Sequence, residues 1–180
     1  AITLANLGPG AIFGELAMLD GEARSASVEA TEDTELLALP ASDMRAQIRQ
    51  VGIRSVDQGE KRLIKEYGLD VYDMRYIDEI GIKCSIEEAL EGLDENTHVH
   101  VSFDVDFLDP SIAPGVGTTV QGGPNYREAQ LVMEMIADTG LMASLDIVEL
   151  NPAFDEHNCT GVLAVDLVES LFGKSTLMRS

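Results

Sequence analysis

The stretch His98-Val99-His100-Val101-Ser102-Phe103-Asp104-Val105-Asp106-Phe107-Leu108-Asp109-Pro110 predicts a buried β-strand that ends in a cluster of acids. Valine and phenylalanine alternate with polar residues, which at a period of two places these polar side chains on one side: His98, His100, Ser102, Asp104 and Asp106. Neighbouring acids repel unless one holds a proton, whereas a divalent metal relieves the repulsion and prefers oxygen ligands. Asp104 and Asp106 are therefore candidate metal ligands, with a structural role as the alternative.

Strands and helices alternate after residue 50. A predicted helix over 58–67 ends at Gly68, a residue type favoured just beyond helix ends. Ser85 and Glu88 have the spacing of a capping box for a helix that extends to residue 93. The remaining predicted strands lie at 51–55, 69–74 and 144–149, and the remaining helices at 126–139 and 160–172. This alternation indicates an α/β fold with a parallel sheet and flanking helices.

The first fifty residues have a different texture. Short apolar runs at 2–7, 27–30 and 36–39 predict strands, and the turns Gly8-Pro9-Gly10 and Asp20-Gly21 separate them. We therefore expect a small β-rich segment over residues 1–50, followed by the α/β segment over residues 51–180.

The charge balance restricts the partners. The chain of 180 residues has 32 acids, 12 Lys and Arg, and a formal net charge of −20. Such a charge disfavours nucleic acid and anionic membranes, and no apolar run reaches the length of a membrane span. No secretory signal is visible at the N-terminus. Cys84 and Cys159 form no CxxC pair, and Cys84 has no histidine nearby at zinc-ligand spacing, so we expect reduced thiols in a cytoplasmic protein; metal binding by Cys159 with His157, two residues away, is the less favoured alternative.

Acids also follow other predicted strands. In open parallel sheets ligands bind beyond the carboxyl ends of the strands. Asp57 and Glu149 occupy such places, as Asp104 and Asp106 do. The alternative for Asp57 and Glu149 is that they cap helices or remain solvated.

Several motifs between residues 51 and 173 occur in a specific order: Gly52-Ile53-Arg54-Ser55-Val56-Asp57, Ser102 to Asp106, Leu108-Asp109-Pro110, Ala113 to Thr118, Gly122-Gly123, Tyr126-Arg127-Glu128 and Val148 to Pro152. In this order they resemble the arginase branch of the ureohydrolase family. The resemblance implies a manganese-dependent hydrolase that acts on arginine or a related guanidino compound. It implies that Asp104 and Asp106 are manganese ligands, that Glu149 faces the guanidinium of the substrate, and that Thr118 lies beside it.

The resemblance is incomplete. The family's remaining ligands, two histidines and two further aspartates, lie in earlier segments, and nothing before residue 51 resembles those segments. His100 does not replace them, because it lies about 13 Å behind Asp104 at roughly 3.3 Å per strand residue. We therefore expect an incomplete catalyst. Missing sheet strands would also leave open edges, so pairing of edges into a homo-oligomer is one expected outcome.

The stretch from Phe13 to Ala30 resembles the phosphate-binding cassette of cyclic-nucleotide-binding domains. A glycine before a short helix offers free N–H groups to an anion, and an arginine pairs well with a phosphate. The resemblance implies that the nucleotide contacts are Gly14, Glu15, Leu16, Arg24 and Ser25. The barrel would be partial, and the chain would be a composite of this cassette and the arginase-like segment. A cyclic-nucleotide-binding module on an inert α/β scaffold is the alternative function.

Overall fold

The computed structural model describes residues 28–35 and 47–177. The chain divides into two compact units, residues 1–48 with 56–69 and residues 49–55 with 70–180. The boundary expected near residue 50 stays a prediction. Each unit is described by itself.

Helix α3 (Gln58–Tyr67) lies in the first unit. Asp57 begins it, because its side chain accepts hydrogen bonds from Gly59 N at 2.6 Å and Glu60 N at 2.9 Å. The Glu60 carboxylate accepts from Asp57 N in return, which completes a capping box. Gly68 ends the helix in the left-handed conformation, with φ of 61°. The predicted helix over 58–67 is confirmed.

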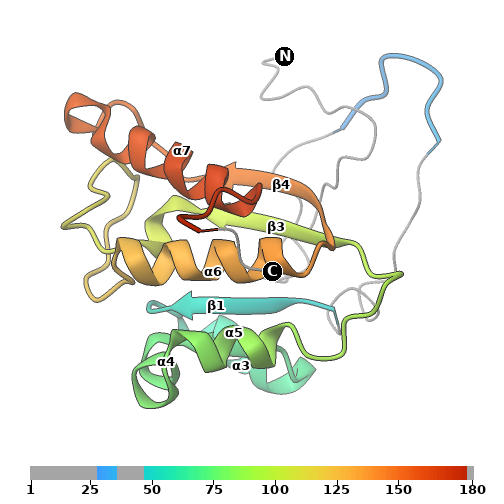
Figure 1. The fold of residues 1–180 in the computed structure, drawn as a ribbon. Helices are drawn as coiled ribbons and strands as arrows, with labels where there is room; N and C mark the ends of the chain where they lie inside the picture. The colour runs from blue at the N-terminus through green and yellow to red at the C-terminus, as the bar shows by residue number, and fades with distance from the viewer. Residues whose placement is uncertain (1–27, 36–46, 178–180) are drawn as a thin grey trace. The chain divides into compact units, whose positions relative to one another are not determined.

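The second unit contains two pairs of parallel strands, β1 with β2 and β3 with β4. Within the described residues each of these strands pairs with one neighbour. Strands β1 and β3 run in the same direction (Figure 1). The parallel α/β fold is confirmed. The elements are β1 (Arg49–Ile53), β2 (Asp70–Asp73), α4 (Met74–Ile80), α5 (Ile82–Ala89), β3 (Val99–Asp104), η1 (Val105–Phe107), α6 (Tyr126–Asp138), β4 (Met142–Val148), η2 (Glu156–Asn158) and α7 (Cys159–Leu171).

Helices α6 and α7 cover one face of the β3–β4 pair (Figure 1). Phe103 projects from β3 into this layer and is buried, while Asp104, the next residue, points the other way along the pleat. Leu167 and Leu171 of α7 are also buried, one turn of helix apart. The main core therefore lies between the helices and the strand pair, and it fixes the ends of β3 and β4.

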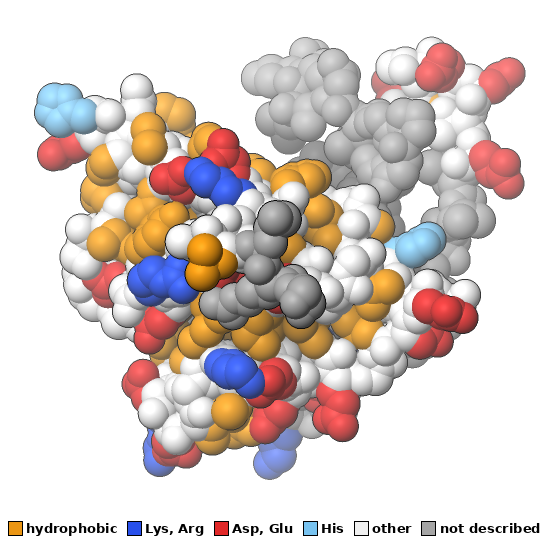
Figure 2. Space-filling view, in the orientation of Figure 1, with side chains coloured by type: hydrophobic (Ala, Val, Ile, Leu, Met, Phe, Trp, Pro, Cys, Tyr) orange, Lys and Arg blue, Asp and Glu red, His pale blue; other side chains and the backbone are white. Residues whose placement is uncertain are grey.

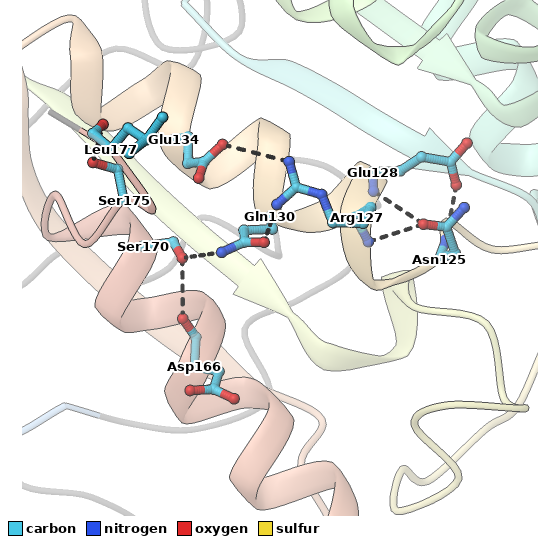
Figure 3. A network of polar contacts seen from close by, with 9 residues as sticks. All are labelled: Asn125, Arg127, Glu128, Gln130, Glu134, Asp166, Ser170, Ser175 and Leu177. Atoms are coloured by element: carbon cyan, nitrogen blue, oxygen red, sulfur yellow. Dashed lines mark hydrogen bonds and ion pairs between the residues drawn. The ribbon is translucent and has the colours of Figure 1, made fainter. Parts of the chain in front are cut away.

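A polar seam joins α6 and α7 (Figure 3). Ser170 is only 1% exposed, so its hydroxyl needs hydrogen-bond partners. It donates to Asp166 O and accepts from Gln130 Nε2, each at 3.2 Å. Asn125 begins α6 with a second capping box, in which Glu128 is the returning carboxylate. The seam fixes how the two helices align over the strands.

A second apolar cluster joins α4 and α5 to α6. Its buried members are Ile77, Ile82, Ile86 and Val132. Ile82 and Ile86 lie one turn apart on α5, which explains why the helix begins at Ile82 rather than at Ser85. The capping-box prediction for Ser85 is wrong: its side chain is buried inside the helix, and its hydroxyl donates to Gly81 O at 3.1 Å.

The β-rich prediction for the first segment fails where it is described. Residues 28–35 contain no strand and are exposed, so the strand expected at 27–30 is wrong over its last three residues. The strands expected at 2–7 and 36–39 lie outside the described residues. A β-ladder needs a partner edge, and residues 28–35 have no such partner within the described part of the chain.

Acidic and basic side chains mix with apolar ones on the face shown in Figure 2. Exposed apolar side chains on or beside α7 include Val162, Val165 and Phe172. No helix in the described part of the chain is long and apolar enough to cross a membrane.

Candidate functional site

Asp104 is the last residue of β3 and the cap of η1. Its Oδ1 accepts a hydrogen bond from Asp106 N at 3.1 Å, which begins the turn. Asp106 therefore lies in the 3₁₀ turn and not on the strand, so its predicted place in the alternating strand pattern is wrong. The turn nevertheless keeps Asp106 beside Asp104, because the capping bond folds the chain back on itself.

Glu149 reaches the same edge from β4. The strand register pairs Asp104 with Val148, and Glu149 is the next residue. Its φ of 63° is left-handed, which costs a residue other than glycine about 1–2 kcal/mol. A Cβ added at Gly117 would lie 3.1 Å from Glu149 Oε2, so the glycine leaves room for this carboxylate. Thr118 follows Gly117 in the same loop and is exposed.

Asp109 organises the loop that carries Thr118. Its Oδ1 accepts from Ser111 N at 3.0 Å, and its Oδ2 accepts from Gly122 N at 2.9 Å and Gly123 N at 3.2 Å. The hydrogen bonds from Ser111 and the glycines lower the pKa of Asp109 to about 2. The carboxylate thus ties the two ends of the loop together.

A buried threonine anchors the middle of this loop. Thr160 Oγ1 accepts from Gly115 N at 2.8 Å, and Gly115 O accepts from Asn151 N at 2.8 Å. Asp155 accepts from Thr160 N at 2.9 Å and from Gly161 N at 2.9 Å, at the start of α7. Partial burial opposes ionisation of Asp155, but these hydrogen bonds outweigh it and lower its pKa to about 2. The start of α7 therefore holds the loop against the Glu149 segment.

The electrostatics of the acid cluster favour a cation. Burial raises the pKa of Asp104 to about 6, and the negative charges of Asp106 and Glu149 add to the shift. Asp104 is half-buried, and no ion pair among the described residues neutralises it. The carboxylate oxygens suit a hard cation. No group of three or more His, Cys, Asp or Glu within the described residues is arranged to hold a metal, so the metal-ligand role of Asp104 and Asp106 stays a prediction.

The histidines before the cluster have other partners. His100 Nδ1 lies 2.7 Å from Ser144 Oγ, and Nε2 lies 3.3 Å from Asp146 Oδ2, both across the strand pair. His98 precedes β3 and is exposed. Asp57 caps α3, as the alternative interpretation expected, and it belongs to the first unit.

The predicted nucleotide contacts Gly14, Glu15, Leu16, Arg24 and Ser25 lie outside the described residues. Cyclic-nucleotide binding therefore stays a prediction from the sequence.

Sequence reasoning assigned no role to Arg54, Asp155 or Thr160. Arg54 follows β1, and its guanidinium donates to four backbone carbonyls, two of them in η1. Arg54, Asp155 and Thr160 share one feature: each has a polar side chain that forms hydrogen bonds with backbone groups of other residues. No spacing rule predicts such contacts, because they depend on where distant segments meet.

Residues 8–173 of this chain match the sequence model of the arginase family. The chain belongs to the arginase family. An arginase from Brucella melitensis is 54% identical over 130 residues, which cover 72% of this chain and 42% of the relative. Nothing in these matches shows a cyclic-nucleotide-binding part.

Solved structures of the family agree with the fold. The crystal structure of arginase from Bacillus subtilis matches with a TM-score of 0.68 and 52% identity, covering 71% of this chain and 45% of that one. Formimidoylglutamase from Bacillus subtilis matches with a TM-score of 0.63 and 29% identity, covering 68% and 39%. The chain thus spans less than half the length of these relatives. Because a similar fold carries differently named activities, the substrate depends on the site residues.

Proposed function

We propose that this chain forms the carboxylate part of an arginase-type site that hydrolyses arginine or a related guanidino compound. The observation that carries the proposal is the half-buried Asp104 carboxylate, which shares the end of the β3–β4 pair with Asp106 and Glu149. The negative charges of Asp106 and Glu149 oppose ionisation of Asp104, and a cation bound beside Asp104 would relieve this repulsion.

Asp104 and Asp106 would hold manganese through their carboxylate oxygens. Manganese, when bound, supplies a nucleophile from water at neutral pH. The chain's own part is to keep the two carboxylates close, which the capping bond from Asp106 N to Asp104 Oδ1 does. The described residues supply no third ligand at this position, so we expect slow turnover unless a further segment completes the shell.

Glu149 would bind the planar guanidinium of the substrate. A carboxylate and a guanidinium pair through two parallel N–H···O bonds. The left-handed backbone at Glu149 and the space left by Gly117 give its carboxylate room to turn toward a ligand. Thr118, in the adjoining loop, would offer a hydroxyl at the rim.

Urea release tests the proposal. The chain, incubated with manganese chloride and arginine, should release urea faster than the Asp104→Asn variant does. Glu149→Gln removes the charge with little change of shape, and it should raise KM, while Glu156→Gln in η2 serves as the control. Equal urea from wild type and Asp104→Asn would overturn the hydrolase assignment.

The cyclic-nucleotide hypothesis rests on the sequence from Phe13 to Ala30 alone. Calorimetric titration with cAMP and cGMP tests it. Binding that is lost in Arg24→Ala would support it, and binding that ignores this change would not be cassette binding.

A further inference from the structure

Arg54 makes five hydrogen bonds to main-chain carbonyls around the acid cluster. Its Nη2 donates to Asp106 O at 2.6 Å and to Val120 O at 3.0 Å. Its Nη1 donates to Phe107 O at 2.8 Å and to Gly52 O at 3.3 Å, and its Nε donates to Val120 O at 3.2 Å. The guanidinium therefore uses its whole fork of donors on backbone oxygens.

These contacts join three segments at one point. Gly52 is part of β1, Asp106 and Phe107 form the turn after β3, and Val120 lies two residues beyond Thr118. The Phe107 ring packs on Gly52 so closely that a Cβ at Gly52 would lie 2.3 Å from a ring carbon. The end of β1 is thus seated on the turn that carries Asp106.

The partners are unusual for an arginine in a chain with net charge −20. Arg54 takes part in none of the ion pairs found among the described residues. It binds the main-chain carbonyl of Asp106 and forms no ion pair with the carboxylate of the same residue. Because the guanidinium is bound to the carbonyls, the Asp106 carboxylate keeps its lone pairs available for another cation.

We propose that Arg54 is a positioning residue for cation binding: it fixes the Asp106 turn and the Val120 loop, and so holds the Asp104 and Asp106 carboxylates in one arrangement. The inference rests on the proposed function, because the cation is the one that the acid cluster would bind. Residues that orient metal ligands from behind change metal affinity about 10–100-fold when they are replaced. Lysine cannot substitute, since a point charge with three donors does not match a planar fork.

Calorimetric titration of the full chain with manganese chloride tests the inference. Arg54→Lys keeps the charge and should weaken manganese binding at least about tenfold. Arg75→Lys is the matched control, because Arg75 is an exposed arginine whose ion pair with Glu79 lies far from the acids in sequence, and its manganese affinity should equal that of wild type. If Arg54 mattered only for folding, Arg54→Lys would have a lower urea midpoint, but the folded variant would bind manganese as tightly as wild type. That result would overturn the inference.

A second measurement on the wild type covers the case in which Arg54→Lys does not fold. If the Arg54 bonds favour cation binding, cation binding must strengthen the Arg54 bonds by the same factor. Saturation with Mg²⁺, a diamagnetic cation that also prefers oxygen, should therefore slow hydrogen exchange of the Arg54 Nε–H in ¹⁵N NMR, while Arg75 Nε–H is unaffected. Unchanged exchange at Arg54 would contradict the inference. A wild-type chain that binds no manganese would instead refute the proposed function and this inference with it.

Discussion

The buried hydroxyl of Thr160 should hold the site loop in place, and Thr160→Val tests this most cleanly. Thr160 is 0% exposed, and its Oγ1 accepts from Gly115 N at 2.8 Å. Valine has nearly the same shape but cannot accept this bond. The bond from Thr160 N to the Asp155 carboxylate involves the main chain and is kept in this variant.

The cost follows from the lack of space around Gly115. A Cβ added there would lie 2.6 Å from Asp155 Cβ and 2.8 Å from Thr160 Oγ1, so a water molecule has no room on that side. An unsatisfied buried N–H costs about 1–3 kcal/mol. Thr160→Ser keeps the hydroxyl and removes one methyl group, which costs about 1 kcal/mol.

Urea denaturation at pH 7 measures both variants. We expect Thr160→Val to lower the free energy of unfolding by about 2 kcal/mol, and more than Thr160→Ser does. A Thr160→Val variant as stable as Thr160→Ser, or more stable, would refute the reasoning about the Gly115 bond.

Three further predictions concern the core, the loop and the acid cluster. Leu167→Ala should lower the free energy of unfolding by about 3 kcal/mol because Leu167 is 0% exposed. Val165→Ala, on the same helix but 60% exposed, should change the free energy of unfolding by less than about 0.5 kcal/mol. Similar urea midpoints for the two variants would contradict the orientation of α7, with Leu167 facing the core and Val165 facing solvent. Asp109→Asn should lower the urea midpoint at pH 7, and the gap should narrow as the pH falls toward about 2, where Asp109 takes up a proton; a gap independent of pH would argue against the carboxylate. The pKa of Asp104 is raised from 3.8 to about 6, so the metal-free fold binds this proton more tightly than the unfolded chain and loses stability as the pH rises from about 4 to about 6. Solvent screening reduces the loss to about 1 kcal/mol. An Asp104→Asn variant whose stability has the same pH profile as wild type would disprove this prediction.

The sequence predicted the elements that depend on local rules. Helix α3 is an example, since Asp57, Glu60 and Gly68 specify both of its ends through their own backbone contacts. The prediction that Ser85 caps a helix failed, because the burial of Ile82 and Ile86 lets the helix begin three residues earlier, at Ile82. Local capping contributes about 1 kcal/mol, and the burial of two isoleucines contributes more.

The candidate site was predictable in part for the same reason. The positions of Asp104 and Glu149 at strand ends could be predicted from the alternation of strands and helices, while the roles of Asp104, Asp106 and Glu149 stay predictions. The place of Asp106 in a turn depends on one capping bond, which the alternating pattern did not indicate. Arg54 and Thr160 act on loops 53 and 45 positions away, and contacts over such separations depend on the folded structure.

Manganese binding tests the central claim, that Asp104 and Asp106 hold a cation at the end of the β3–β4 pair. Electron paramagnetic resonance counts free manganese directly, because the sharp hexaaqua signal is lost when the ion binds. We expect the full chain at pH 8 to remove this signal in a saturable titration, and Asp104→Asn to abolish most of the effect. The exposed Asp78→Asn variant should bind as wild type does. Loss of signal that is equal in wild type and Asp104→Asn, or no loss in either, would contradict the claim.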